Sequence, residues 1–177
     1  MNLPNALQVL HEELAIPSDY ASVCGLPIVE EPAELASIGF DIEGRERFLA
    51  ADSAPKWRAL CAAAAAQNLC LQVVSAYRSI DYQADLFRNK LRRGLRIEDV
   101  LCVNAAPGFS EHHSGRALDL TTPGYEALSQ GFETSPAFAW LTEHAKDFGF
   151  VMSYPRDNPW GIDYEPWHWC ARADSAG

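Results

Sequence analysis

The chain has 177 residues and a formal net charge of −10, with 48% hydrophobic residues and 5 tryptophans. This apolar content excludes an intrinsically disordered chain, because burying so much apolar surface offsets the entropy lost on folding. The acidic balance argues against a general nucleic-acid-binding protein, which needs a basic face, and no apolar run reaches the ~20 residues of a membrane-spanning helix.

The N-terminus and the cysteines bear on the cellular compartment. The first residues lack the basic start, apolar middle and small-residue cleavage site of a secretory signal. The 5 cysteines cannot all pair, and the apolar neighbours of Cys70 and Cys102 favour buried free thiols in a reducing compartment. We therefore expect a cytoplasmic protein, or a periplasmic one if a signal has been removed. The sequence predicts no oligomeric state.

The chain is predicted to begin with an acidic arm over residues 1–37, followed by a single domain over residues 38–177. The first 45 residues are acidic and contain Pro4, Pro17, Pro27 and Pro32. Such a segment is expected to wrap the outside of the domain, with one short helix near residues 4–15. The alternative is a solvated and loosely structured arm.

Beyond this arm, apolar periodicity and capping residues predict the elements. Pro55 suits the first turn of a helix, and Ser79 and Ser135 can cap two more, with Gly94 and Gly149 at their ends. Helices are predicted for residues 55–68, 79–94 and 135–149, and strands for 69–75, 117–120, 150–154 and 164–171. Helices and strands do not alternate regularly, so we expect an α+β fold: a small antiparallel-rich sheet with helices packed around it.

The first candidate site is the segment Ser110-Glu111-His112-His113-Ser114-Gly115-Arg116-Ala117-Leu118-Asp119. In the predicted strand, Leu118 and Leu120 point into the core, so Asp119 points the other way, into a groove above the sheet. His112 comes before a glycine that permits a turn, so an imidazole and a carboxylate can meet at one point. Spacing alone does not choose between His112 and its neighbour His113.

The second candidate site is Glu165-Pro166-Trp167-His168. In a regular strand Glu165 and His168 face opposite sides, but Pro166 can bend the segment and bring both to one side. Two histidines, one aspartate and a free glutamate suit a catalytic zinc site, which needs three ligands, an open position for water and a base beside it. The alternative for each histidine is a packed side chain without a metal.

Together these motifs resemble a known family. The pattern Ser110-x-His112-x-x-Gly115-x-Ala117-x-Asp119, followed by Glu165-Pro-Trp-His168, is similar to that of the zinc D-alanyl-D-alanine carboxypeptidases of the VanY type, within the peptidoglycan-cleaving LAS metallopeptidases. Ser75-Ala76-Tyr77-Arg78-Ser79, leading into Tyr82-Gln83, resembles the family's substrate-anchoring segment. The likeness runs from Ile38 to His168, so the predicted domain of residues 38–177 is VanY-like.

The resemblance implies a role for each candidate residue. His112, Asp119 and His168 are expected to bind one zinc ion per chain in a groove on the sheet, which leaves His113 beside the ligand or exposed. Glu165 is expected to be the catalytic base. Arg78 is expected to be catalytic and to bind substrate, because its planar fork suits a terminal carboxylate or an oxyanion; the alternative is a surface ion pair. Ser110, Tyr77 and Gln83 are expected to contact the substrate.

The expected reaction is the hydrolysis of a C-terminal D-alanine from a peptidoglycan stem peptide. An L,D-carboxypeptidase that trims tetrapeptides in cell-wall recycling is favoured, because a D,D-enzyme in the cytoplasm would attack the pentapeptide precursor. The alternatives are a D,D-carboxypeptidase, a peptidoglycan endopeptidase and a non-catalytic binding module. The basic run of residues 88–93 is expected to be a solvated helix end, or else to attract an anionic muropeptide.

Overall fold

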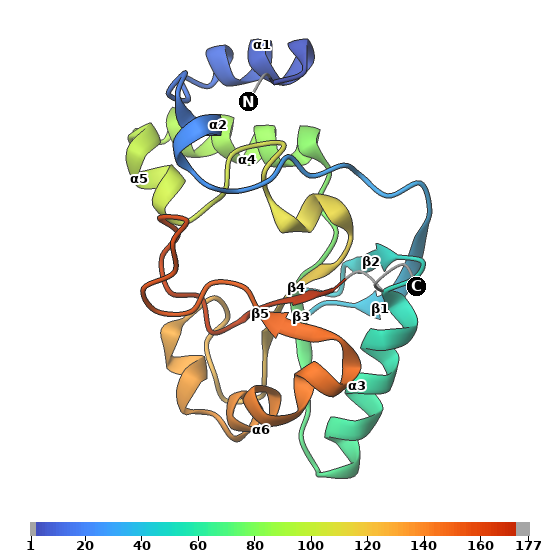
Figure 1. The fold of residues 1–177 in the computed structure, drawn as a ribbon. Coiled ribbons are helices and arrows are strands. Elements are labelled where there is room, and N and C mark those ends of the chain that lie inside the picture. The colour runs from blue at the N-terminus through green and yellow to red at the C-terminus, as the bar shows by residue number, and fades with distance from the viewer. Residues whose placement is uncertain (1–2, 173–177) are drawn as a thin grey trace.

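The computed structural model describes residues 3–172, which form short helices around a small central sheet (Figure 1). The α-helices are α1 (Asn5–Glu13), α2 (Tyr20–Val23), α3 (Ala54–Ala66), α4 (Ile80–Arg92), α5 (Ile97–Cys102) and α6 (Pro136–His144). The 3-10 turns are η1 (Glu111–Ser114), η2 (Gln130–Thr134) and η3 (Ala145–Phe148). The strands are β1 (Leu35–Phe40), β2 (Glu46–Ala50), β3 (Gln72–Ser75), β4 (Ala117–Thr121), β5 (Phe150–Met152) and β6 (His168–Ala171).

The main sheet has four strands in the order β3-β4-β6-β5, and every neighbouring pair in it is antiparallel. A separate antiparallel hairpin joins β1 to β2. This arrangement confirms the α+β fold with a small antiparallel sheet. Strand β4 is central and its five residues are all buried, so a polar side chain on it is enclosed by the protein.

Two apolar clusters hold the sheet between layers of helices. One cluster packs α3 and α6 against β3, β4 and β6 through Trp57, Leu118 and Leu141. The other joins the N-terminal segment to α4 and α5 through residues that include Phe87 and Val100. In Figure 1, α1, α2, α4 and α5 lie on one side of the sheet and α3 and α6 on the other. Strands β4 and β6 therefore lie where these two layers meet.

Capping residues fix several of the predicted helix starts. The Oγ of Ser79 accepts a hydrogen bond from the backbone of Tyr82 at 3.1 Å, and the Oγ of Ser135 accepts one from Phe138 at 3.0 Å. Each bond satisfies an N–H group that the first turn of a helix leaves free. The predicted helix over 135–149 is divided, because α6 ends at His144 and continues as the tighter turn η3.

The first 45 residues hold more structure than the sequence predicted. The expected helix is present as α1, but α2 and the β1–β2 hairpin were missed, and the loosely structured alternative is wrong. Leu14, Tyr20 and Leu26 are buried against the α4–α5 layer, which a local pattern rich in proline does not reveal. The boundary at residue 37 falls inside β1, and the division into arm and domain stays a prediction.

Two further expectations were wrong, and one helix was missed. The strand predicted over 164–171 begins only at His168, because residues 165–168 form a turn closed by a hydrogen bond from His168 N to Glu165 O at 3.1 Å. Helix α5 was not predicted. Cys70 and Cys102 are exposed rather than buried, because Cys70 lies in the loop between α3 and β3 and Cys102 is the last residue of α5; all 5 cysteines are free thiols.

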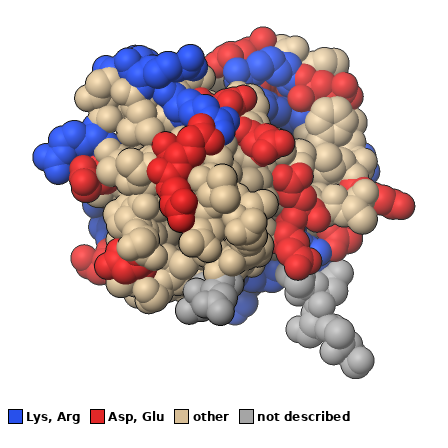
Figure 2. All heavy atoms as spheres, turned by 90° about the horizontal axis from the view of Figure 1, so that it is seen from above, with Lys and Arg blue, Asp and Glu red and all other residues tan. Residues whose placement is uncertain are grey.

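The surface of the described chain carries both signs of charge. On the face above α1, α2, α4 and α5, acidic side chains separate the basic ones (Figure 2).

Among residues 3–172, no helix has the length and apolar character needed to cross a membrane.

Candidate functional site

The pairing of β4 with β6 brings together two residues that are distant in sequence. In this antiparallel register Asp119 lies directly opposite His168, so both side chains stand on the same face of the sheet. His168 Nδ1 lies 3.0 Å from Asp119 Oδ1. Both side chains are buried. The sequence predicted that Asp119 would point into a groove above the sheet, and its burial agrees with that prediction.

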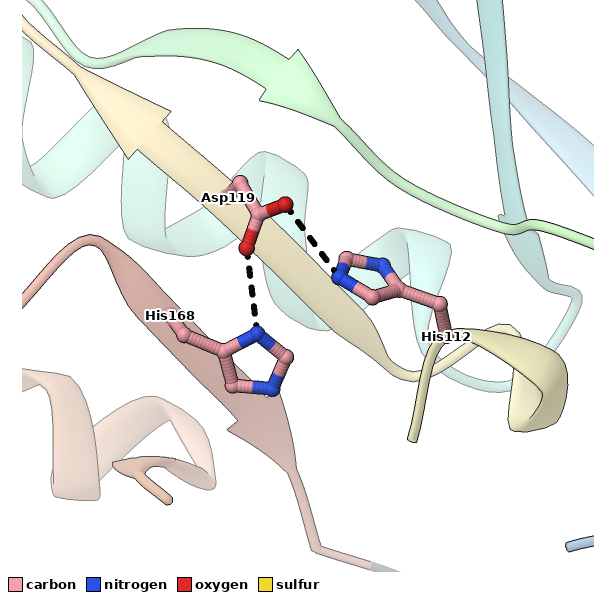
Figure 3. A group of neighbouring side chains, drawn as sticks. All are labelled: His112, Asp119 and His168. Carbon is pink, nitrogen blue, oxygen red and sulfur yellow. Dashed lines mark hydrogen bonds and ion pairs between the residues drawn. The ribbon is translucent and has the colours of Figure 1, made fainter. Parts of the chain in front are cut away.

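His112 reaches the same point from the turn η1. The Oγ of Ser110 accepts a hydrogen bond from the backbone of His112 at 3.4 Å and so caps the turn. Gly115 ends the turn with a φ of +65°, a conformation that favours glycine. Figure 3 shows the His112, Asp119 and His168 side chains converging from η1, β4 and β6.

The donor atoms of these three residues fit a metal ion. The Nδ1 of His112 donates to the Ala76 carbonyl at 2.7 Å, so its Nε2 lone pair faces Asp119 Oδ2 at 3.2 Å. Burial lowers the pKa of His112, against the opposing effect of Asp119, and so favours the neutral ring. Two acceptors this close repel each other unless a cation lies between them. One ligand atom from each residue lies within 4.8 Å of the others, and this donor set of two histidines and a carboxylate suits zinc.

Glu111 orients the second histidine, a role that the sequence analysis missed. Its Oε2 lies 3.0 Å from the Nε2 of His168. Burial would raise the pKa of Glu111, but the hydrogen bond from His168 lowers it to about 2, so the carboxylate is ionised. A proton held on Nε2 by Glu111 directs Nδ1 toward Asp119, where it could bind a metal in place of a proton. Its place beside His112 in the motif was the available signal.

Glu165 lies beside these three candidate metal ligands without being one of them. The turn of residues 165–168 brings its carboxylate to the same side as His168, with Oε2 3.8 Å from His168 Nδ1. Burial, together with the negative charge of Asp119, raises the pKa of Glu165 to about 7, although His168 and Arg78 act in the opposite direction. A carboxyl group with this pKa can both accept and release a proton near neutral pH.

Arg78 extends toward the same point from the segment after β3. Its Nη1 donates to Gln83 Oε1 at 2.7 Å, and its Nη2 donates to Ser75 Oγ at 3.2 Å and lies 3.8 Å from Asp119 Oδ2. Gln83 is itself fixed, because its amide donates to the Ala105 carbonyl at 2.9 Å. The guanidinium is thus held in one orientation before any ligand binds, and it is not a surface ion pair.

Two candidate residues have other environments than expected. His113 is fully buried rather than exposed: its Nδ1 donates to the Arg78 carbonyl at 2.7 Å, and its Nε2 accepts from Gly108 N at 3.1 Å, so it fixes the backbone that carries Arg78. Tyr77 points away from the site, because side chains alternate along an extended segment. Its hydroxyl donates to Glu31 at 2.6 Å and Tyr77 does not line the cavity described below, so its contact with the substrate stays a prediction.

A cavity of about 510 Å³ joins these groups. Its lining includes seven of the eight candidate residues, namely Arg78, Gln83, Ser110, His112, Asp119, Glu165 and His168. Tyr154 also lines it, with its ring centroid 4.7 Å from that of His168. The cavity is large enough for a short peptide.

Comparison with known proteins supports this reading of the site. The family model described as VanY, D-alanyl-D-alanine carboxypeptidase, matches residues 46–173. The chain belongs to the VanY family. A putative carboxypeptidase of Bacillus subtilis, YodJ, is 28% identical over 181 aligned positions, which cover 94% of this chain and 60% of YodJ. The chain therefore spans less than two thirds of that relative.

Two solved structures of the family share the fold. The LdcB LD-carboxypeptidase matches with a TM-score of 0.71 and 28% identity, covering 82% of this chain and 71% of LdcB. The second structure is a variant of a vancomycin-resistance D,D-pentapeptidase, VanY, in complex with Zn(II). It matches with a TM-score of 0.61 and 26% identity, and the match covers 84% of this chain and 88% of the VanY chain. Zinc is thus the metal of a VanY site similar to this one, and His112, Asp119 and His168 are the residues here that would hold it.

Proposed function

We propose that this protein is a zinc-dependent carboxypeptidase that removes a C-terminal D-alanine from peptidoglycan stem peptides. One observation carries the proposal: three metal-ligand side chains, a separate carboxylate and a fixed arginine line one cavity. A domain that only bound peptides would have no need of Glu165 beside the three ligands. The description of the family as D-alanyl-D-alanine carboxypeptidases, and the peptidoglycan recognition described for the similar LdcB LD-carboxypeptidase, support the same substrate class.

Each group at the site has a separate role in hydrolysis. Zinc, when bound, supplies a Lewis acid that polarises a carbonyl and lowers the pKa of water to about 7. Glu165 accepts the proton of the attacking water and returns it to the leaving amine, because its carboxylate lies beside the three candidate ligands without being one of them. Arg78 stabilises the oxyanion or the terminal carboxylate through its two-pronged hydrogen bonding. Gln83 and Ser75 hold that fork in place.

We favour an L,D-carboxypeptidase that trims tetrapeptides in the cytoplasm during cell-wall recycling. A D,D-carboxypeptidase there would destroy the pentapeptide precursor of wall synthesis, whereas trimming of recovered tetrapeptides does no such harm. The likeness to the LdcB LD-carboxypeptidase supports this preference. The likeness to a D,D-pentapeptidase favours the second candidate, a D,D-carboxypeptidase acting on pentapeptides.

Product analysis by mass spectrometry tests the proposal. The zinc-loaded protein is incubated with a tetrapeptide, a pentapeptide, and a tetrapeptide whose terminal carboxylate is amidated. Loss of one D-alanine from the tetrapeptide alone supports the L,D-enzyme, and loss from the pentapeptide alone supports the D,D-enzyme. Because Arg78 would lose a charged partner, amidation should lower kcat/KM about tenfold to a hundredfold. Equal rates with the amide would indicate an endopeptidase, and no product from any peptide would refute the proposal.

A further inference from the structure

The cavity contains a cation that the proposed chemistry does not use. Helix α4 turns Gln83, Leu86 and Lys90 toward the cavity, and their spacing of three and four residues places them on one face of the helix. Lys90 is half-buried. It belongs to the basic run of residues 88–93, for which the sequence allowed two interpretations: a solvated helix end, or a group that attracts an anionic muropeptide.

Lys90 differs from the other cations nearby in having no ionic partner among the residues that the structure describes. Arg45 and Arg47 also line the cavity, but both form ion pairs with the buried Asp41 at 2.8 and 2.7 Å. Arg88, in the same basic run, pairs with Glu13 and Asp85. Within residues 3–172, the Lys90 ammonium has neither a hydrogen bond nor an ion pair.

The surroundings of Lys90 leave its charge uncompensated. Burial lowers the pKa of Lys90, and the positive charge of Arg78 lowers it further, whereas Glu165 raises it. An unpaired ammonium in a partly dry wall is unfavourable, and an anionic ligand would relieve this cost. The geometry therefore provides a place for a negative group near the reacting end of a bound peptide.

The position of Lys90 along α4 indicates which negative group fits. Gln83 contacts Arg78, and Lys90 follows seven residues later, about 10 Å further along the helix axis. The terminal carboxylate of the substrate belongs near Arg78, so Lys90 faces a different part of the peptide. Stem peptides carry either lysine or diaminopimelate before the D-alanine. Diaminopimelate is lysine with one more carboxylate, on the terminal carbon of the side chain.

We infer that Lys90 binds the side-chain carboxylate of a diaminopimelyl residue and so makes the site selective for diaminopimelyl over lysyl stem peptides. This inference rests on the proposed function and adds a substrate class to it. A lysyl side chain would place its ammonium against that of Lys90, with no carboxylate to separate the two charges. Selectivity would then come from one attraction and one repulsion.

The test compares two tetrapeptides that differ only in this carboxylate. The wild-type protein should show a higher kcat/KM for the diaminopimelyl peptide. Lys90→Met keeps the apolar stem and removes the charge, so the ratio of the two kcat/KM values should fall about tenfold to a hundredfold. Lys90→Glu should invert the preference. Any general effect on Glu165 changes both peptides alike and cancels in the ratio.

Arg93→Met is the matched control, because Arg93 is an exposed cation of the same basic run and does not line the cavity. It should leave the ratio unchanged. An unchanged ratio in Lys90→Met would overturn the inference while leaving the proposed function intact. A second result would also overturn the inference. If Lys90→Met cleaved the free-acid and the amidated tetrapeptide at equal rates, Lys90 would be the residue that binds the terminal carboxylate. No cleavage of either peptide by the wild type would remove the proposed function, and this inference with it.

Discussion

Gly115→Ala should lower the free energy of unfolding for two reasons: the left-handed backbone of residue 115 and the close approach of the Ala50 backbone. Comparison with a second glycine separates the two costs. Gly115 has a φ of +65°, and a Cβ added there would lie 2.7 Å from the backbone nitrogen of Ala50 and 3.2 Å from Pro32 Cγ. The same Ala50 nitrogen donates a hydrogen bond to the Gly115 carbonyl at 2.7 Å. The new methyl group therefore meets backbone that cannot move without breaking that bond.

The expected loss of unfolding free energy follows from three effects. A non-glycine residue in the left-handed region costs about 1–2 kcal/mol, overpacking about 1–3 kcal/mol, and the weakened hydrogen bond about 1 kcal/mol. Together they predict a loss of about 3–6 kcal/mol, a large part of the stability of a typical domain. Because Gly115 connects η1 to β4, the change should also move His112 relative to Asp119 and weaken zinc binding.

Urea unfolding with a chelator present measures the stability without a contribution from metal. Gly161→Ala is the control, because Gly161 has a similar φ of +68° but nothing within 4 Å of the added Cβ. It should cost only about 1–2 kcal/mol. Equal losses in the two variants would refute the argument that the approach of Ala50 requires glycine at position 115.

Two further substitutions test the roles of the acidic residues. Glu165→Gln should keep about one zinc per chain, measured by elemental analysis, yet lose roughly 10²–10⁴-fold in kcat, because it removes a proton acceptor and no ligand; loss of the metal would contradict this role. Glu111→Gln should raise the Kd for zinc roughly 10–100-fold by titration calorimetry, because His168 loses its charged partner. The exposed Glu126→Gln serves as its control, and equal zinc affinities in these two proteins would show that Glu111 does not act through His168.

The sequence predicted the parts of the fold that depend on local signals. Ser79 and Ser135 mark helix starts because a hydroxyl before an apolar stripe satisfies the first free N–H groups. The alternation of Leu118, Asp119 and Leu120 predicts which way the carboxylate points, because side chains alternate along any strand. In both cases the information lies within a few residues.

Features that depend on distant contacts were missed or misjudged. Tyr20 and Leu26 look like parts of an exposed arm until helix α4 and Phe109 cover them. The Tyr77 hydroxyl bonds to Glu31, which lies 46 residues away in the sequence, so no local pattern around Tyr77 indicates this contact. Glu111 meets His168 only because β6 pairs with β4, over a separation of 57 residues. No local pattern contains the register that decides these contacts.

Two carboxylates of the site, Asp119 and Glu165, show how position sets chemistry. Asp119 is buried between two histidines, which hold its pKa well below the usual range, so it stays ionised and suits a permanent ligand. Glu165 lies at the cavity wall, where burial and the charge of Asp119 raise its pKa to about 7. A carboxylate that holds its charge can bind a cation, and one that exchanges a proton near neutrality can act as acid and base. The two roles therefore follow from the β4–β6 register and the turn of residues 165–168, which place one group between the histidines and the other beside them.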